Sequence, residues 1–330
     1  MEKLTHRERI ENTLSNGYVD HLPCAFWRHF PVDDQYADRL AKATKAFQDS
    51  FELDIIKVSP SSSFCLSDWG VQDIWTGNPE GTRDYLKPVI KSPDDWSKLK
   101  PLDPRKGALG RQLECLKLLS KEYHQKTPII QTIFSPLSQA KNLVGKSNLI
   151  WHLRKAPDLL KAGLDVILES TIQFLEELKK LKIDGIFYAV QHASIEYLSE
   201  SEFHTFVYQY DIKAIKPAND FWLKLLHLHG NHIRTSQFAD YPVNIINWHD
   251  RETDPDLSQG KMIFQDKVLC GGLNRIETMV LGDSPKIQKE IDDAIVQTSS
   301  HPLILGTGCV LPITTPYGNI RAVVDYLKSR

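Results

Sequence analysis

A series of short apolar runs is the feature that most limits what this 330-residue chain can fold into. Most of the runs are apolar at successive positions, which is typical of parallel strands that helices cover on both faces. Stretches with apolar residues at helical spacing separate them, at residues 157–181, 199–210, 284–295 and 317–327. The eight runs are residues 22–27, 54–58, 128–133, 185–190, 222–229, 243–248, 268–273 and 303–308.

Eight strand-like runs that alternate with helices predict a (β/α)8 TIM barrel. No linker, internal repeat or low-complexity tract divides the sequence, so we expect one domain over residues 1–330. Residues 59–110 are rich in Pro, Asp, Ser and Gly and are too long for an ordinary connection after the second strand. We therefore expect a long insertion at the catalytic face, with short strands of its own. A doubly wound open sheet is the alternative, although no glycine-rich phosphate fingerprint follows a run.

The composition excludes several classes of partner. The formal net charge is −2 and the sequence has no dense Lys/Arg block, so we expect no nucleic-acid partner. No apolar stretch is long enough to span a membrane, so we expect no membrane partner either. Five scattered cysteines and a polar beginning without the apolar core of a signal peptide favour a cytoplasmic protein. The oligomeric state stays open, and a homodimer is one expectation.

Chemically active residue types cluster just after the predicted strands, where barrel enzymes build their sites. Five of the twelve histidines lie at these positions. Barrel cores have little use for imidazole, so this clustering favours a binding site for a small-molecule substrate. We predict substrate contacts from four of the residues at strand ends, which are His29, Ser135, His192 and His249.

Two strand ends carry metal-binding residue types. The run at 222–229 ends in His227-Leu228-His229, and the run at 303–308 is followed by Cys309. Residues i and i+2 of a strand face the same side, so both imidazoles would point together. Parallel strands would bring the thiol to the same rim, which predicts a zinc site with one open position, as in catalytic centres. The alternative is a pair of hydrogen-bonded histidines beside a buried cysteine.

Two further residues are candidates for catalysis. Arg28 follows the first run and could hold a carboxylate or phosphate in a bidentate contact. Its alternative role is an ion pair with an acid on the rim. Asp68 lies in the predicted insertion and could position the substrate, or it could serve as an ordinary turn or helix cap.

Several motifs are shared with one known family. They are Arg7-Glu8-Arg9-Ile10, Asp20-His21-Leu22-Pro23, residues 132–137, Asp184-Gly185-Ile186, and a tail over residues 305–312 that continues to Thr315-Pro316 and Asn319. Through these motifs the chain resembles, over nearly its whole length, the uroporphyrinogen decarboxylase superfamily. That superfamily also contains zinc-dependent methyltransferases that act on methylated corrinoid proteins. The resemblance implies a single (β/α)8 barrel with the site at its mouth.

The decarboxylases of the superfamily carry an Arg-Gln-x-Gly-Arg-Tyr stretch whose arginines bind the acidic side chains of the porphyrinogen. The corresponding residues 27–31 hold one arginine, Arg28, and no glycine. A neutral histidine does not replace the missing bidentate arginine. Asp68 matches an aspartate that the decarboxylases direct at the pyrrole NH groups. Cofactor-free uroporphyrinogen decarboxylation, a step of porphyrin and haem biosynthesis, is therefore our second hypothesis, with Asp68 stabilising the intermediate and Arg28 binding carboxylates.

The methyltransferase branch holds zinc through a His-x-Cys-Gly motif and a later Gly-Cys. Residues 227–230 and Gly308-Cys309 match this layout, with His229 in place of the first cysteine. The replacement keeps a zinc donor but removes one thiolate charge, so the metal would be more Lewis acidic. Our first hypothesis is thus zinc-dependent methyl transfer between a corrinoid, carried by a partner protein, and a thiol-type acceptor. The third is a non-catalytic barrel that binds a small ligand or a corrinoid protein.

Overall fold

A parallel sheet forms the centre of the computed structural model, which describes residues 3–330. Its strands are β1 (Ile56–Val58), β4 (Ile129–Phe134), β5 (Gly185–Val190), β6 (Leu223–Leu228), β7 (Ile245–Trp248), β8 (Val268–Leu273) and β9 (Leu303–Thr307). The seven strands pair in this order, each parallel to the next. Seven of the eight predicted strands are therefore confirmed.

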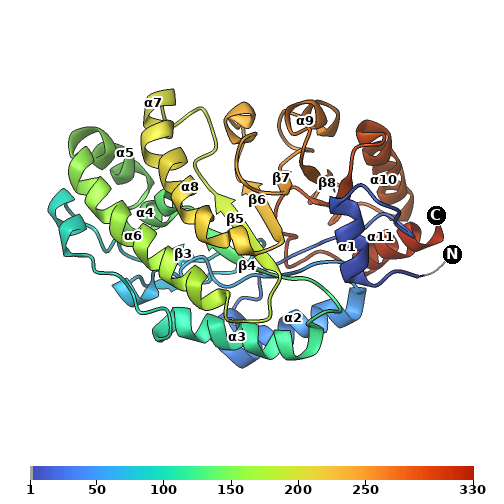
Figure 1. Ribbon diagram of the computed structural model, residues 1–330, viewed down its shortest axis with the longest axis horizontal. Coiled ribbons are helices and arrows are strands. Elements are labelled where there is room, and N and C mark those ends of the chain that lie inside the picture. The colour runs from blue at the N-terminus through green and yellow to red at the C-terminus, as the bar shows by residue number, and fades with distance from the viewer. Residues whose placement is uncertain (1–2) are drawn as a thin grey trace.

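Helices surround the strands in Figure 1. They are α1 (His6–Leu14), α2 (Ala37–Phe51), α3 (Gly107–Tyr123), α4 (Pro136–Val144), α5 (Lys146–Lys155), α6 (Pro157–Leu178), α7 (Glu200–Phe203), α8 (Gln209–Ile215), α9 (Leu257–Ile263), α10 (Ser284–Thr298) and α11 (Tyr317–Ser329). The predicted helix at 157–181 ends three residues early. The helical stretch predicted from residue 199 starts with a cap, because the Ser199 hydroxyl accepts a hydrogen bond from the Glu202 amide at the start of α7. No helix within residues 3–330 combines the length and the apolar character needed to cross a membrane.

The first predicted strand, residues 22–27, differs from the expectation. It forms only an isolated parallel bridge, between Cys24 and Leu305 of β9. Leu305 donates its amide to the Pro23 carbonyl at 2.8 Å and accepts the Ala25 amide at 2.9 Å. On its other side the segment accepts the Asp54 amide at the Cys24 carbonyl, at 2.9 Å. Pro23 has no N–H to add to a ladder, which limits the pairing to this short stretch.

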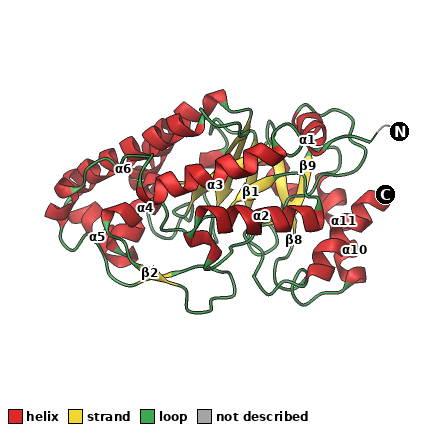
Figure 2. Cartoon of the chain, turned by 90° about the horizontal axis from the view of Figure 1, so that it is seen from below, coloured by secondary structure: helices red, strands yellow, loops and turns green. Residues whose placement is uncertain are grey.

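The predicted insertion after β1 contains a small hairpin. Strands β2 (Asp73–Ile74) and β3 (Asp84–Tyr85) pair antiparallel and form a separate two-stranded sheet. The insertion is four residues shorter than predicted, because α3 begins at Gly107. In Figure 2, α2 and α3 lie in front of β1 and cover this side of the sheet.

Two apolar layers separate the inside of the sheet from the outside. The inner layer includes Ile55, Ile130, Phe187, Leu225 and Cys270, which come from five different strand segments. A much larger layer fills the space between the strands and the surrounding helices. Apolar residues on both faces explain why the strands read as continuous apolar runs in the sequence.

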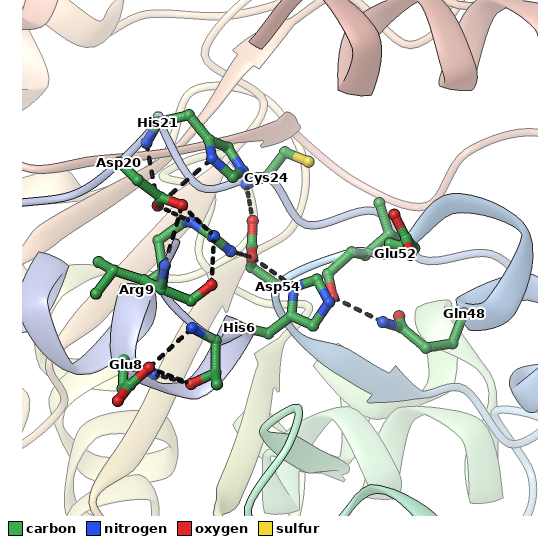
Figure 3. A network of polar contacts seen from close by, with 12 residues as sticks. His6, Glu8, Arg9, Asp20, His21, Cys24, Gln48, Glu52 and Asp54 are labelled. Carbon is green, nitrogen blue, oxygen red and sulfur yellow. Dashed lines mark hydrogen bonds and ion pairs between the residues drawn. The ribbon is translucent and has the colours of Figure 1, made fainter. Parts of the chain in front are cut away.

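Two arginines of α1 hold the amino ends of two strands. The buried Arg9 donates at 2.5 Å to Asp54, which lies two residues before β1 and also accepts the Cys24 amide at 2.8 Å (Figure 3). Arg7 donates at 2.6 Å to Asp184, which directly precedes β5. Charged groups therefore stabilise the amino end of the sheet, the end opposite to the predicted site.

Candidate metal centre and its cavity

Four side chains that can bind a metal meet at the carboxyl ends of the strands. They are His227, His229, His249 and Cys309, and one donor atom of each lies within 4.8 Å of the other three. His227 is in β6, His229 directly follows it, His249 directly follows β7, and Cys309 lies two residues after β9. The predicted convergence of His227, His229 and Cys309 is thus present in the structure. His249, predicted as a substrate contact, joins them as a fourth donor.

The spacing of the donors suits a tetrahedral zinc ion. Zinc lies about 2.3 Å from sulfur and about 2.0–2.1 Å from imidazole nitrogen, which puts neighbouring donors roughly 3.3–3.7 Å apart. Cys309 Sγ lies 3.7 Å from His227 Nε2 and 3.7 Å from His229 Nδ1. His249 Nε2 lies 3.4 Å from His229 Nδ1. The residues present therefore fit zinc.

The hydrogen bonds of Asn247 determine which nitrogen of His227 faces the cluster. Asn247 Nδ2 donates to the carbonyls of Cys270 (2.7 Å) and Thr307 (3.1 Å), so its Oδ1 is the atom that faces His227. His227 Nδ1 lies 2.7 Å from this oxygen and must carry the proton. The lone pair of Nε2 is left pointing toward Cys309. A buried partner of this kind is what orients a metal-binding imidazole.

His249 has a carboxylate partner behind it. Its Nδ1 lies 3.3 Å from Glu252 Oε2, and the other oxygen of Glu252 accepts a hydrogen bond from Arg275 at 2.9 Å. This arrangement leaves His249 Nε2 free to face the cluster, as in the carboxylate–histidine pairs of zinc sites.

Gly308 allows the chain just after β9 to pass close to the end of β7. A Cβ atom at this position would lie 2.5 Å from the His249 Cα and 2.6 Å from the Trp248 carbonyl oxygen. Only glycine fits at this position. Its small size lets Cys309 come close to His229, just after β6, and to His249, just after β7.

The electrostatics of the cluster favour a thiolate. Burial raises the pKa of the Cys309 thiol, but the nearby imidazoles of His227, His229 and His249 outweigh it and hold this pKa well below its ordinary value. Burial lowers the pKa of His249, but Cys309 and Glu252 outweigh it in turn and raise that pKa to about 9. The thiolate is the form of cysteine that binds metals.

A cavity of about 220 Å³ opens beside the cluster. His227, His229 and Cys309 form part of its wall, together with the aromatic rings of Trp27 and Phe187. The insertion after β1 covers another part of the wall. Its contribution is Pro60, Ser62, Glu80, Thr82, Arg83 and Tyr85. The insertion therefore lies at the site, where the sequence predicts it.

Of the three other predicted substrate contacts, one lines the cavity and two do not. His29 lines the cavity, and burial together with the charge of Lys57 lowers its pKa to about 4. His192 is buried after β5 and is absent from the cavity wall; burial and two lysines lower its pKa to about 3. Ser135 is buried at the start of α4, where its amide donates to the Ala189 carbonyl at 3.0 Å, and it is also absent from the wall.

The two predicted catalytic residues lie away from the cavity. Asp68 accepts a hydrogen bond from the Ala108 amide at 2.9 Å, so it caps the start of α3, which was the alternative role. The Arg28 guanidinium lies 5.5 Å from the centre of the Phe30 ring, and Nε contacts the His29 carbonyl at 3.4 Å. The structure gives neither residue a contact with the metal-binding cluster.

Sequence reasoning missed two polar residues inside the sheet, Asn247 and Lys57. Both are buried in runs that are otherwise apolar, Ile245–Trp248 and Ile56–Val58. A polar side chain within such a run is the signal that could have found them, since buried polar groups require partners.

The sequence and the structure of the chain are similar to those of known proteins. The sequence profile described as uroporphyrinogen decarboxylase (URO-D) matches residues 5–330. The methylcobamide:CoM methyltransferase MtbA of Methanosarcina mazei is 22% identical over 352 residues, which cover 100% of this chain and 99% of that protein. The methylcobamide:CoM methyltransferase MtaA of Methanosarcina barkeri is 26% identical over 215 residues, which cover 64% of this chain and 61% of that protein. A solved methyltransferase from Methanosarcina mazei superposes with a TM-score of 0.85 at 20% identity and 99% coverage of both chains.

Proposed function

Because the chain belongs to the uroporphyrinogen decarboxylase family, we propose that it is a zinc-dependent enzyme that transfers a methyl group between a corrinoid protein and a thiol-type acceptor. The observation that carries this proposal is the cluster of three imidazoles and one thiol at the spacing of zinc ligands. Relatives named methylcobamide:CoM methyltransferases, similar over the whole chain, support the reaction type.

The proposal gives each residue of the site a task. His227, His229 and Cys309 would hold the metal, and His249 would take the position that the sequence analysis leaves open, so that an acceptor thiol would either replace this imidazole or join as a fifth ligand. Bound zinc is a Lewis acid that lowers the pKa of a thiol coordinated to it, which supplies a thiolate nucleophile at neutral pH. Asn247 keeps the His227 proton on Nδ1, away from the cluster.

Metal analysis tests the zinc site. Protein purified without chelator should contain close to one zinc per chain, and Cys309→Ala should contain none. Cys115→Ala is a matched control, because Cys115 is a fully buried free thiol in α3 with no part in the cluster. Wild-type protein that binds no zinc would contradict the proposal.

An activity assay tests the reaction. Zinc-loaded protein should demethylate a methylated corrinoid protein, or free methylcobalamin, in the presence of a thiol, and the methylated thiol should form in equal amount. Protein that binds zinc and a corrinoid protein but transfers no methyl group would instead support the third hypothesis, a non-catalytic barrel.

Two observations weigh against decarboxylation of uroporphyrinogen. A cavity of about 220 Å³ is small for a macrocycle with eight carboxylates. Neither Arg28 nor Asp68 lines it. Turnover of uroporphyrinogen that survives complete removal of zinc would reverse this conclusion.

Further features of the first hypothesis belong to this proposal. Residues 22–27 would close the sheet into the eight-stranded barrel, which their hydrogen bonds to Leu305 and Asp54 support. A single domain over residues 1–330, a cytoplasmic location and a homodimer remain predictions. Sedimentation of the zinc-loaded protein tests the homodimer directly.

A further inference from the structure

A chain of charged side chains connects His249 of the metal-binding cluster to the hairpin of the insertion, residues 73–85. Glu252 contacts His249 Nδ1 with one oxygen, at 3.3 Å, and accepts a hydrogen bond from Arg275 Nε with the other, at 2.9 Å. Arg275 uses a different nitrogen, Nη1, to donate to Glu80, which lies in the turn between β2 and β3. The chain therefore runs from the end of β7, through the loop after β8, to the tip of the hairpin.

Arg275 lies near the cluster as well as near the hairpin. Its side chain is only 12% exposed. Burial lowers the pKa of Arg275, but the charges of Cys309 and of its two carboxylate partners outweigh burial and raise this pKa above its ordinary value. A guanidinium is planar and holds its donors in a fixed fork, so two acids bound to different nitrogens fix its orientation. The position of Arg275, and with it that of Glu252, therefore depends on Glu80.

The tip of the hairpin also contacts the chain at two other places on the rim. The Ile313 amide, six residues after β9, donates to the Pro79 carbonyl at 2.7 Å. Gly81 packs on His29, because a Cβ atom at Gly81 would lie 2.6 Å from the His29 Cβ. Within the hairpin, β2 and β3 pair with each other, so it can move as one unit when the contacts of its tip break.

The hairpin covers part of the approach to the cluster. Glu80, Thr82, Arg83 and Tyr85 of the hairpin form part of the cavity wall. A methyl group that a partner protein carries must reach the cluster from outside the barrel, at the carboxyl ends of the strands. Access for the partner and movement of the hairpin are therefore connected.

The partner of His227 is of a different kind. Asn247 is fully buried in β7, and its amide donates to the carbonyls of Cys270 and Thr307. Movement of the hairpin leaves this partner in place. The sheet itself thus orients His227, whereas the partners of His249 lead out to the hairpin.

We propose that Glu80 and Arg275 are positioning residues for His249, and that the closed hairpin keeps this imidazole in the cluster. When the hairpin lifts, Arg275 loses one of its two acids and no longer fixes Glu252, so His249 is free to leave. The position of His249 would then open for the acceptor as the mouth opens for the methyl donor. This inference rests on the proposed function, because it takes the cluster to hold zinc.

A double-mutant cycle on zinc affinity tests the connection. Glu80→Gln keeps the shape of the side chain but removes the charge that holds Arg275. Loss of a direct partner of a metal-binding histidine typically costs 10- to 100-fold in affinity, and Glu80 acts through two intermediates, so we expect zinc to bind about three- to tenfold more weakly. In a His249→Ala background the same substitution should change the affinity by less than about twofold, because the imidazole on which it acts is gone.

Asp84→Asn is the matched control for the change of charge. Asp84 is an exposed carboxylate of the same hairpin, and it accepts a hydrogen bond from Thr76 at 2.6 Å. Its substitution should leave the zinc affinity within about twofold of the wild-type value. An effect of Glu80→Gln that is equally large in the His249→Ala background would come from the lost charge alone and would overturn the inference. Unchanged zinc affinity in Glu80→Gln would overturn it as well.

Hydrogen exchange measures the connection in the reverse direction. Coupling between two sites is reciprocal, so bound zinc should hold the hairpin closed by the same factor. The Ile313 amide, which is bonded to Pro79, should exchange about three- to tenfold more slowly in zinc-loaded than in metal-free wild-type protein. Glu80→Gln and His249→Ala should each abolish this difference. A difference that persists in both variants would arise without the chain of charged residues and would count against the inference.

The outcomes separate this inference from the proposed function. Wild-type protein that binds no zinc would overturn both. Zinc-loaded protein that shows the expected cycle but transfers no methyl group would support the inference and refute only the reaction. Protein that transfers methyl groups but shows equal effects of Glu80→Gln in the two backgrounds would refute the inference alone.

Discussion

Replacing Asn247 with leucine should weaken zinc binding although every zinc donor remains in place. The leucine removes the acceptor that keeps the proton on His227 Nδ1. His227 can then carry its proton on Nε2, the atom that faces Cys309, and must give it up before binding metal. Loss of such a partner typically lowers metal affinity 10- to 100-fold, which corresponds to about 1.4–2.7 kcal/mol.

The same substitution should also lower the stability of the metal-free protein. The Asn247 amide donates to the carbonyls of Cys270 and Thr307, so leucine leaves both without this donor. Buried groups that lose a hydrogen bond typically cost about 1–3 kcal/mol. Zinc affinity is measured by competition with a chromogenic chelator, and the free energy of unfolding by urea titration of the metal-free protein.

A matched control separates the two effects. Asn244, just before β7, accepts the Lys224 amide at 2.8 Å and donates to the Trp222 carbonyl at 2.6 Å, far from any zinc donor along the same strand. Asn244→Leu should lose a similar free energy of unfolding but keep the zinc dissociation constant within about twofold. Wild-type zinc affinity in Asn247→Leu would refute the reasoning about the proton, and an equal loss in Asn244→Leu would attribute it to general loosening.

Three other substitutions extend these tests. His249→Ala should still bind zinc through the remaining three donors, but at least tenfold more weakly, as measured by the same competition assay; unchanged affinity would exclude His249 as a ligand. Gly308→Ala should lower the free energy of unfolding by about 1–3 kcal/mol, because its Cβ would lie 2.5 Å from the His249 backbone; calorimetry checks this, and a neutral result would show that β9 can shift freely. Asp20 accepts hydrogen bonds from Arg9, which outweigh the effect of burial and hold the pKa of this carboxyl below its ordinary value of about 3.9. In acid the unfolded chain therefore binds more protons than the folded protein. The contribution of Asp20 to stability is complete above about pH 4 and disappears as the pH falls through the lowered pKa. The destabilisation by Asp20→Asn should accordingly be largest near pH 7 and shrink toward pH 2, and a difference independent of pH would contradict this origin.

Apolar runs predicted most of the fold, because a parallel sheet covered on both faces requires them. The run at 22–27 has the same composition but forms only a bridge, since Pro23 cannot donate to a strand on either side. Composition shows where a segment is buried, whereas the extent of its pairing depends on individual backbone donors.

The candidate site could be predicted where spacing along one strand is sufficient. His227 and His229 are two residues apart on β6, so their common direction follows from strand geometry. His249 joins the cluster because of the register between β6 and β7, in which His227 lies opposite Asn247, two residues before His249. Register is a tertiary property, and for this reason His249 was predicted as a substrate contact and not as a metal donor.

Asp68 shows the opposite difficulty. Its partner, the Ala108 amide, is 40 residues away and begins a helix that the sequence pattern did not separate from the insertion. An aspartate in a loop near a predicted active site can be mistaken for a catalytic group when the helix that it caps is not known.

The positions of Arg9 and Asp54 have a consequence for how this enzyme could diversify. The ion pair between Arg9 and Asp54 lies at the amino end of the sheet, whereas the metal-binding cluster lies at the carboxyl end. Substitutions in the cavity can therefore change the acceptor without removing the contacts that hold the first helix and the first strand together. The residues of the cavity wall and the ion pair between Arg9 and Asp54 are separate sets, whereas Asn247 and Gly308 serve both the site and the stability of the fold.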